Sequence, residues 1–295
     1  MILNASGCLD ALAAPGIARS LDVFVTKTVT PLPREGNAPT RIAEAEGAML
    51  NSIGLANPGL DRFLGATLPA LARIGVRLWV SVGGFCADDY AHVCARLDER
   101  DDVEAVELNV SCPNVASPAE ATEEIVAAAR GATSKPIFAK LSPAVPDVAE
   151  LARAAAAAGA DGLSLVNTLR GLVLDRGTLA PVLSTASGGL SGPALRPVAL
   201  AAVFSCARAT ELPIVAMGGI ETGRHALDAI AAGASAVALG TVLFRDPAAP
   251  VRIRAELAVE AAARGYERAL DARGAAHDAV RGVNGGVEKM PANPR

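Results

Sequence analysis

The stretch DVAELARAAAAAGADGLSLV, residues 147–166, predicts one helix followed by one strand. Residues 147–158 are rich in alanine, the residue with the highest helix propensity, and Gly159 directly after them is typical of a helix C-cap. The apolar run from Gly162 to Val166 predicts a short buried strand. The stretch RHALDAIAAGASAVAL, residues 224–239, repeats the order of helix, glycine and strand. Two such units far apart in the chain indicate a repeating α/β architecture.

Eight short apolar runs can form strands, and most are separated by helix-like segments. The predicted strands are Ile2–Ala5, Val23–Lys27, Leu78–Val82, Val106–Val110, Ile137–Leu141, Gly162–Val166, Ile214–Met217 and Ala236–Leu239. Eight strands that alternate with helices predict an α/β fold, the (β/α)8 TIM barrel. We expect one barrel domain over residues 1–270 and a weakly ordered C-terminal tail over residues 271–295.

The composition excludes several classes of protein. The chain has 295 residues, 51% of them hydrophobic, and a net charge of −4. Its charges are scattered, so no basic stripe or polybasic cluster indicates nucleic acid or a membrane surface. No apolar run approaches the ~20 residues of a membrane-spanning helix, and Met1–Asp10 lacks the basic start of a signal peptide.

The cysteines indicate a reducing compartment. The five, Cys8, Cys86, Cys94, Cys112 and Cys206, form no CxxC pair. An odd and dispersed set is typical of free thiols, so we expect a cytoplasmic protein. The same spacing argues against a zinc or iron–sulfur site in this chain, and we expect no metal.

Polar residues or glycines follow almost every predicted strand. They are Ala5-Ser6-Gly7, Lys27-Thr28, Ser81, Asn109, Lys140, Asn167-Thr168, Gly218-Gly219 and Gly240-Thr241. In a closed barrel these strand ends surround one mouth, where such enzymes carry their active sites. Turn chemistry alone accounts for the glycines and serines, but less well for lysines and asparagines after buried runs. Two long connections, residues 28–78 and 168–214, are also expected to carry function.

The segments after the last two strands, Gly218-Gly219 and Gly240-Thr241, indicate a phosphate site. Barrels often bind phosphate with the loops after strands seven and eight, and glycine lets the backbone approach the anion. The segment Gly188–Pro193 can add further backbone donors. This pattern fits FMN and equally any sugar phosphate. No GxGxxG or GxxxxGK[ST] motif is present, which argues against a Rossmann dinucleotide site or a P-loop.

The two strand-end lysines, Lys27 and Lys140, should each face an anion or a dipole, because a buried unpaired ammonium is costly. A flavin gains negative charge at N1 and O2 on reduction, and a fixed ammonium there favours that step. Lys140 suits this role, and Lys27 could bridge flavin and substrate. A Schiff-base lysine is the competing interpretation, since lyase barrels also use a strand-end lysine.

A thiol in Asn109-Val110-Ser111-Cys112-Pro113-Asn114 is the candidate base. A free thiol has a pKa of ~8.5, which makes Cys112 a usable base near neutral pH. Asn109 and Asn114 can hydrogen-bond an imide or a carboxylate. The three histidines, His92, His225 and His277, are interpreted as surface or structural residues.

Taken together, these residues resemble the dihydroorotate dehydrogenase family over roughly residues 2–247. The segments that carry the resemblance are residues 4–7 (NASG), 25–28 (VTKT), 49–59 (MLNSIGLANPG), 107–114 (ELNVSCPN), 139–143 (AKLSP), 166–168 (VNT), 188–193 (GGLSGP), 217–220 (MGGI) and 239–241 (LGT). The resemblance implies an FMN-dependent barrel that oxidises dihydroorotate to orotate in de novo pyrimidine biosynthesis. In that role Cys112 is the base and hydride passes to flavin N5, with Lys27 also at the catalytic site.

The resemblance also implies the residues that bind. FMN would contact Ala5, Ser6, Lys27, Thr28, Ser81, Asn109, Lys140, Val166, Gly192, Gly218, Gly219, Gly240 and Thr241. The substrate would contact Lys27, Asn51, Ser52, Ile53, Gly54, Leu55, Asn109, Asn114, Asn167 and Thr168. Cysteine in place of serine as the base is typical of the soluble class. The sequence of residues 51–59 looks most like that of the subclass that pairs with an FAD and iron–sulfur subunit and uses NAD. The family resemblance also implies a homodimer.

Three departures from the family pattern keep alternatives open. The chain starts almost on its first strand, residues 115–124 look shorter than the usual active-site loop, and Ser81 stands where this subclass often has asparagine. One alternative is an FMN oxidoreductase that acts on another dihydropyrimidine or cyclic imide. Others are a flavin-free phosphosugar lyase or isomerase that uses Lys140, and a regulatory barrel that binds a phosphorylated ligand.

Overall fold

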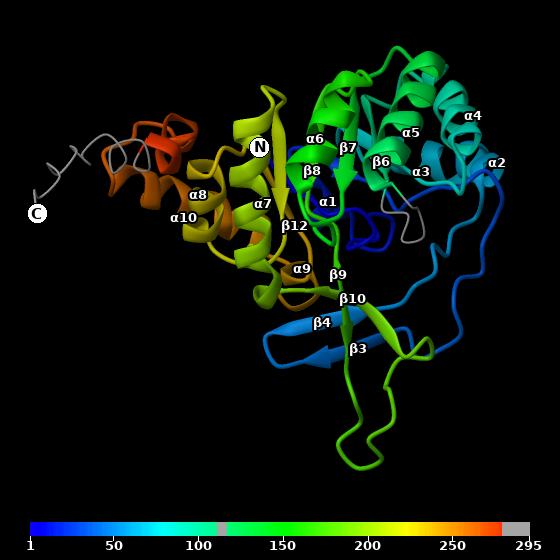
Figure 1. Ribbon diagram of the computed structural model, residues 1–295, viewed down its shortest axis with the longest axis horizontal. Helices are drawn as coiled ribbons and strands as arrows, with labels where there is room; N and C mark the ends of the chain where they lie inside the picture. The colour runs from blue at the N-terminus through cyan, green and yellow to red at the C-terminus, as the bar shows by residue number, and fades with distance from the viewer. Residues whose placement is uncertain (111–116, 279–295) are drawn as a thin grey trace, which may run out of the picture.

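A computed structural model describes residues 1–110 and 117–278 of the chain, and its centre is a barrel of eight parallel strands (Figure 1). The strands are β1 (Ile2–Asn4), β2 (Phe24–Val25), β5 (Leu78–Val82), β6 (Ala105–Asn109), β7 (Ile137–Leu141), β8 (Gly162–Leu165), β11 (Ile214–Met217) and β12 (Ala236–Leu239). Their order is β1-β12-β11-β8-β7-β6-β5-β2, and a parallel bridge between Leu3 and Val23 joins the two ends. All eight predicted strands are present, and the (β/α)8 barrel is confirmed.

Helices cover the outside of the barrel. They are α1 (Pro15–Arg19), α2 (Leu60–Arg62), α3 (Leu68–Ala72), α4 (Ala87–Asp98), α5 (Pro118–Ala132), α6 (Val148–Ala157), α7 (Arg196–Ala209), α8 (Gly223–Ala231), α9 (Val242–Arg245) and α10 (Ala249–Ala262). A π-helical turn, Phe63–Thr67, joins α2 to α3, and 3-10 turns occupy Pro193–Leu195 and Ala269–Ala272.

The two helix-to-strand units predicted from the sequence have the expected ends. The Asp147 side chain caps α6 by accepting from the Ala149 N–H at 2.9 Å, and Gly159 follows the helix with φ +96°. Gly233 ends α8 in the same way, with φ +121°. A positive φ costs glycine little, so the backbone turns sharply into the next strand after each of these two helices.

Two apolar layers hold the barrel together. Side chains of alternate strand residues point inward, and Leu3, Val25, Trp79 and Met217 belong to the cluster that fills the interior. The residues between them point outward and pack against the helices in a much larger cluster, which includes Leu108 and Leu163. Because both faces of each strand are buried, the strands read as continuous apolar runs.

The two long connections form a second, antiparallel sheet that the sequence did not predict as strands. Its members are β3 (Ile42–Ala45), β4 (Ala48–Asn51), β9 (Leu169–Leu172) and β10 (Ser187–Ser191), in the order β3-β4-β10-β9. We call it the arm sheet. It projects from the barrel at the mouth, as Figure 1 shows, and has its own small core around Ala43, Leu50 and Leu183.

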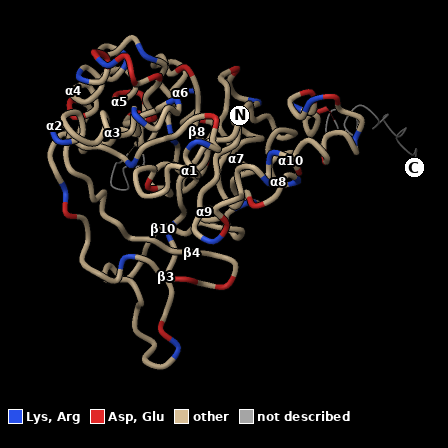
Figure 2. The backbone as a smooth tube through the Cα atoms, turned by 180° about the vertical axis from the view of Figure 1, so that it is seen from behind, with Lys and Arg blue, Asp and Glu red and all other residues tan. Residues whose placement is uncertain are grey.

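Positive and negative residues are interspersed over the molecule instead of gathering by sign (Figure 2). This distribution agrees with the scattered charge of the sequence. Within the described residues, no helix is both long and apolar enough to cross a membrane. Residues 271–278 are described, and the predicted weak order of residues 271–295 stays a prediction.

Candidate active site

A cavity of about 770 Å³ opens at the carboxyl ends of the barrel strands, and the arm sheet contributes part of its wall. Ligand sites in proteins usually measure about 300–1,000 Å³, so this space can hold a cofactor-sized molecule. The predicted site residues that line it are Ala5, Ser6, Lys27, Thr28, Asn51, Ser52, Ile53, Gly54, Leu55, Asn109, Lys140, Val166, Asn167, Thr168, Gly192, Gly218, Gly219, Gly240 and Thr241. The fold thus gathers segments from the whole barrel at one place.

Among the predicted site residues that the structure describes, Ser81 alone does not line this cavity. Ser81 is fully buried inside the barrel, where its hydroxyl lies 3.0 Å from the Thr28 hydroxyl and its N–H donates to Thr26 Oγ1. Ser81 therefore orients the Thr28 hydroxyl without lining the cavity itself. Cys112 and Asn114 lie outside the described residues.

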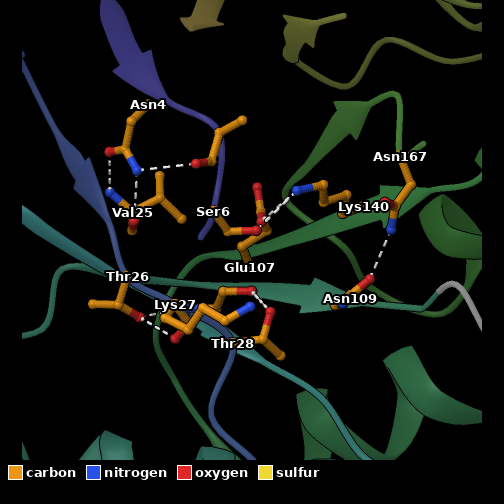
Figure 3. Close-up of polar contacts among 12 residues, drawn as sticks. Asn4, Ser6, Val25, Thr26, Lys27, Thr28, Glu107, Asn109, Lys140 and Asn167 are labelled. Atoms are coloured by element: carbon orange, nitrogen blue, oxygen red, sulfur yellow. Dashed lines mark hydrogen bonds and ion pairs between the residues drawn. The ribbon is translucent and has the colours of Figure 1, made fainter. Parts of the chain in front are cut away.

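Lys140 is the most firmly held charge in the cavity. Its Nζ donates to Ser6 Oγ at 2.9 Å and lies 3.4 Å from Glu107 Oε1 (Figure 3). The side chains of Lys140 and Glu107 are 7% and 1% exposed. A buried ion pair of this kind fixes the position of the ammonium more than it stabilises the fold.

Lys27 and Cys8 complete a group of ionisable side chains on the same wall. Burial lowers the pKa of Lys27; Cys8 partly offsets that shift, and Lys140 adds to it. Burial raises the pKa of the Cys8 thiol, although the nearby Lys140 and Lys27 ammonium groups lower it in part. These shifts follow from taking charged forms out of water and placing like charges together.

Two asparagines from neighbouring strand ends orient one another. Asn167 Nδ2 donates to Asn109 Oδ1 at 2.8 Å, and Asn167 Oδ1 accepts from the Thr168 N–H. The Tyr90 hydroxyl donates to the main-chain carbonyl of Asn109, which anchors the end of β6. The two amides are thus held in defined orientations on the cavity wall, as a site that recognises imide or carboxylate groups requires.

The loops predicted to bind phosphate meet at glycines. Gly218 and Gly219 have φ of +120° and +69°. A Cβ at Gly219 would stand 2.7 Å from the Gly192 carbonyl oxygen and 2.8 Å from Arg196 Cβ. Only glycine fits this approach, which brings the β10 connection against the loop after β11. The result is a backbone-lined cradle at the place where the sequence predicts a phosphate.

Sequence reasoning missed several residues of the site. Glu107 looked like an ordinary polar residue in a strand, although its two-residue offset from Asn109 places both on the inward face. Cys8 was not among the predicted site residues, and Met49 and Arg170 lie on arm strands that were not predicted. The side chains that line the cavity include three cations, Lys27, Lys140 and Arg170, and, among the described residues, no carboxylate.

Several known proteins are similar to this chain over most of its length. The family model described as "Dihydroorotate dehydrogenase" matches residues 1–260. The chain is 44% identical over 264 residues to the dihydroorotate dehydrogenase B (NAD(+)) catalytic subunit of Desulforudis audaxviator, covering 87% of this chain and 86% of that protein. It is 41% identical over 256 residues to the same subunit of Listeria monocytogenes, covering 83% and 84%.

Two further proteins extend the comparison. The putative dihydroorotate dehydrogenase A (fumarate) of Solibacter usitatus is 42% identical over 259 residues and 85% of each chain. Among solved structures, the crystal structure of DHODH in complex with ferulenol from Eimeria tenella superposes with a TM-score of 0.78. It is 25% identical and covers 94% of this chain and 85% of that one.

Proposed function

The chain belongs to the dihydroorotate dehydrogenase family. Like the other members, it is a flavin-dependent oxidoreductase of pyrimidine biosynthesis. We propose that the flavin is FMN and that Cys112 is the base. The observation that carries the proposal is the single cavity. Nearly every residue predicted to hold FMN or dihydroorotate lines it, although these residues come from distant parts of the sequence.

The described residues fit FMN. A Cβ would come within 2.9 Å of a neighbouring atom at Gly218 and within 2.7 Å at Gly219, and Gly192 has φ +93°, so glycine suits all three positions. Without side chains there, main-chain N–H groups can approach a phosphate. Lys140, fixed by Ser6 and Glu107, supplies a buried positive charge for the ring. When bound, FMN supplies an acceptor for the hydride that leaves C6 of dihydroorotate.

The chain's own side chains would bind and orient the substrate. Asn51, Asn109 and Asn167 present amide groups to the cavity, which suit the imide and carboxylate of dihydroorotate. Lys27 adds a positive charge on the same wall. Asn51, on β4 of the arm sheet, approaches from the side opposite the barrel, so the arm would also help to exclude water.

Cys112 would remove the proton from C5 of the substrate. It lies outside the described residues, but it follows Asn109, the last residue of β6, by three positions. Asn109 lines the cavity, and three residues of chain span at most ~10 Å. This assignment rests on the sequence motif.

The names of the relatives indicate the electron acceptor. Two relatives, at 44% and 41% identity, are named as catalytic subunits of an NAD(+)-linked enzyme. We therefore propose a partner subunit that carries FAD and an iron–sulfur cluster, with NAD as the final acceptor and a homodimer of this chain at the centre of a cytoplasmic complex. A relative named for fumarate makes fumarate the second candidate acceptor.

One spectroscopic experiment tests the proposal. The purified chain should be yellow, release FMN on denaturation, and bleach when dihydroorotate is added without oxygen. Bleaching by dihydrouracil but not by dihydroorotate would favour another dihydropyrimidine as substrate. A colourless protein that borohydride traps on Lys140 in the presence of a phosphosugar would refute the proposal and favour the lyase alternative.

The acceptor needs its own measurement. Flavin reduced by dihydroorotate should be reoxidised by fumarate only slowly in the isolated chain. Rapid turnover with NAD should appear only when the electron-transfer subunit is supplied. Rapid reoxidation by fumarate alone would contradict the NAD-linked assignment.

A further inference from the structure

Glu107 is a carboxylate in the interior of the barrel that the proposed chemistry does not use. It is 1% exposed and points inward from the middle of β6. In the strand register, Glu107 lies beside Phe138 and Asn109 lies beside Lys140. Glu107 therefore lies one layer below the residues that face the cavity. Carboxylates are almost never buried to this extent unless they are paired.

Its partner is the cavity lysine. Glu107 Oε1 is 3.4 Å from Lys140 Nζ, and the Ser6 hydroxyl oxygen accepts a hydrogen bond from the same ammonium at 2.9 Å. Figure 3 shows the three side chains converging from β6, β7 and the segment after β1. The lysine ammonium is thus held in one position before any ligand arrives.

Glu107 also changes the charge of the pocket. Lys27 and Lys140 line the cavity, and Lys27 has no carboxylate within ion-pair distance among the described residues. Apart from Arg170 on the arm sheet, the two ammonium groups and the one carboxylate leave a single net positive charge at the barrel strands. Without the carboxylate, the net charge of this group of side chains would double.

We propose that Glu107 is a positioning residue that fixes Lys140 and, by cancelling one of two positive charges, lowers the affinity of the site for reduced flavin. The inference rests on the proposed binding of FMN. A pocket with two uncompensated cations would stabilise the negative charge of reduced flavin strongly. The electrons would then pass less readily to an acceptor. The carboxylate keeps enough positive charge for reduction and still allows reoxidation.

The test is a set of charge variants read by the flavin midpoint potential and by the dissociation constant of sulfite, an anion that adds to oxidised flavin. Both readouts are independent of turnover. They are measured at about pH 6, far below the ordinary lysine pKa of ~10.4. At an effective dielectric constant of ~20, removing one unit charge about 10 Å from an anion changes the stability of that anion by roughly tenfold.

Glu107→Gln should therefore bind sulfite about tenfold more tightly and raise the midpoint potential by about 30 mV, the equivalent of tenfold for a two-electron couple. Glu107→Asp keeps the charge and should stay near the wild-type values. The matched control is Glu104→Gln. Glu104 is exposed at the other end of β6, where it pairs with Arg77, and its substitution should change neither readout.

A double-mutant cycle keeps the test decisive if Glu107→Gln loses its flavin. The Lys140→Gln variant should have a lower potential than the wild type. Adding Glu107→Gln to it removes the unpaired buried carboxylate and should return the potential to near the wild-type value. Equal potentials in the single Lys140 variant and the double variant would overturn the proposal.

The outcomes separate this inference from the proposed function. A wild-type chain that takes up no FMN overturns both. A wild-type chain that binds FMN and is bleached by dihydroorotate, with a Glu107→Gln variant at the wild-type potential, overturns the role of Glu107 alone.

Discussion

The side chain of Asn4 closes the barrel by imitating a peptide group for Val25. Its Nδ2 donates to the Val25 carbonyl and its Oδ1 accepts from the Val25 N–H, both at 2.8 Å (Figure 3). The strands β1 and β2 are short, and one isolated bridge is the backbone pairing between them. Asn4 is fully buried, so both polar groups of Val25 depend on it.

Replacing Asn4 with alanine should destabilise the fold markedly. Two buried backbone groups would lose their partners, at about 1–3 kcal/mol each. We expect the free energy of unfolding, measured in urea, to fall by about 2–5 kcal/mol. The control is Asn37→Ala, because Asn37 is half-buried and its side-chain amide hydrogen-bonds to Ser52 in the same long connection. This substitution should lower the free energy of unfolding by less than about 1 kcal/mol. A loss in Asn4→Ala no greater than in Asn37→Ala would contradict the closure role.

The barrel was predictable because its physics is local. A strand buried on both faces needs an apolar residue at nearly every position, and runs such as Ile214–Met217 meet that requirement in the sequence alone. The glycine turns after α6 and α8 are equally local. The position of the strand-end lysines and asparagines at the mouth then followed from the general geometry of barrels.

The arm sheet was not predictable in this way. Its strand β10 contains two consecutive glycines, and β3 contains alanine and glutamate, so neither has a strand-like composition. They form strands because residues far apart in the chain pair, as Asn51 does with Gly189. Glu107 was missed for a related reason: the partner that makes it tolerable, Lys140, lies on another strand.

Gly219→Asp should abolish FMN binding. The glycine has φ +69°, and a Cβ there would meet the Gly192 carbonyl oxygen at 2.7 Å. A carboxylate next to a phosphate at ~4 Å costs roughly 4 kcal/mol at an effective dielectric constant of ~20, so the dissociation constant for FMN should rise by roughly a hundredfold or more. Flavin content after gel filtration and fluorescence titration measure the effect.

The matched control for that substitution is Gly131→Ala. A Cβ at Gly131, near the end of α5, meets nothing within 4 Å. Flavin content should therefore be unchanged, and stability should rise by up to about 1 kcal/mol because alanine favours the helix. Full FMN content in Gly219→Asp would rule out this part of the wall as the phosphate site.

Stability should fall in acid partly through Asp98. Its carboxylate accepts from the Thr133 hydroxyl and from the Ser134 N–H, each at 2.7 Å. These bonds lower its pKa from 3.8 to about 2. A carboxyl group whose pKa is lower in the folded state stabilises the fold above its unfolded value, and that contribution is lost as the pH falls through the folded value.

The measurement compares the urea midpoints of the wild type and Asp98→Asn across pH. Above about pH 4, the unfolded value, the wild type should be the more stable. The difference should shrink as the pH falls toward about 2. A difference that stays constant over this range would show that the carboxylate charge at position 98 has no part in it.

Cys112→Ala should slow the reduction of bound FMN by dihydroorotate while FMN stays bound. General base catalysis contributes about 10²–10⁴-fold, and stopped-flow absorbance should show a loss of that size. The control is Cys86→Ser, since Cys86 is exposed and does not line the cavity. Reduction at the wild-type rate in the alanine variant would remove Cys112 from the mechanism.

Arg170 should guide the anionic substrate to the cavity. It lies on β9, opposite Gly189, on the face of the arm sheet that also carries Asn51. The cavity wall holds cations and no described carboxylate, whereas the whole chain is negative, at −4. A positive mouth on a negative protein attracts an anion such as dihydroorotate and raises its rate of association.

Arg170→Ala should therefore lower kcat/KM for dihydroorotate several-fold at low ionic strength, with kcat nearly unchanged, because a charge that acts at a distance speeds encounter but not chemistry. Near 1 M salt the screening length is ~3 Å, and the variant should then match the wild type. Arg176→Ala is the matched control, since Arg176 lies in the same hairpin beyond β9 but does not line the cavity. A loss that persists at high salt would mean that Arg170 contacts the bound substrate directly, and equal losses in the two variants would assign the effect to net charge.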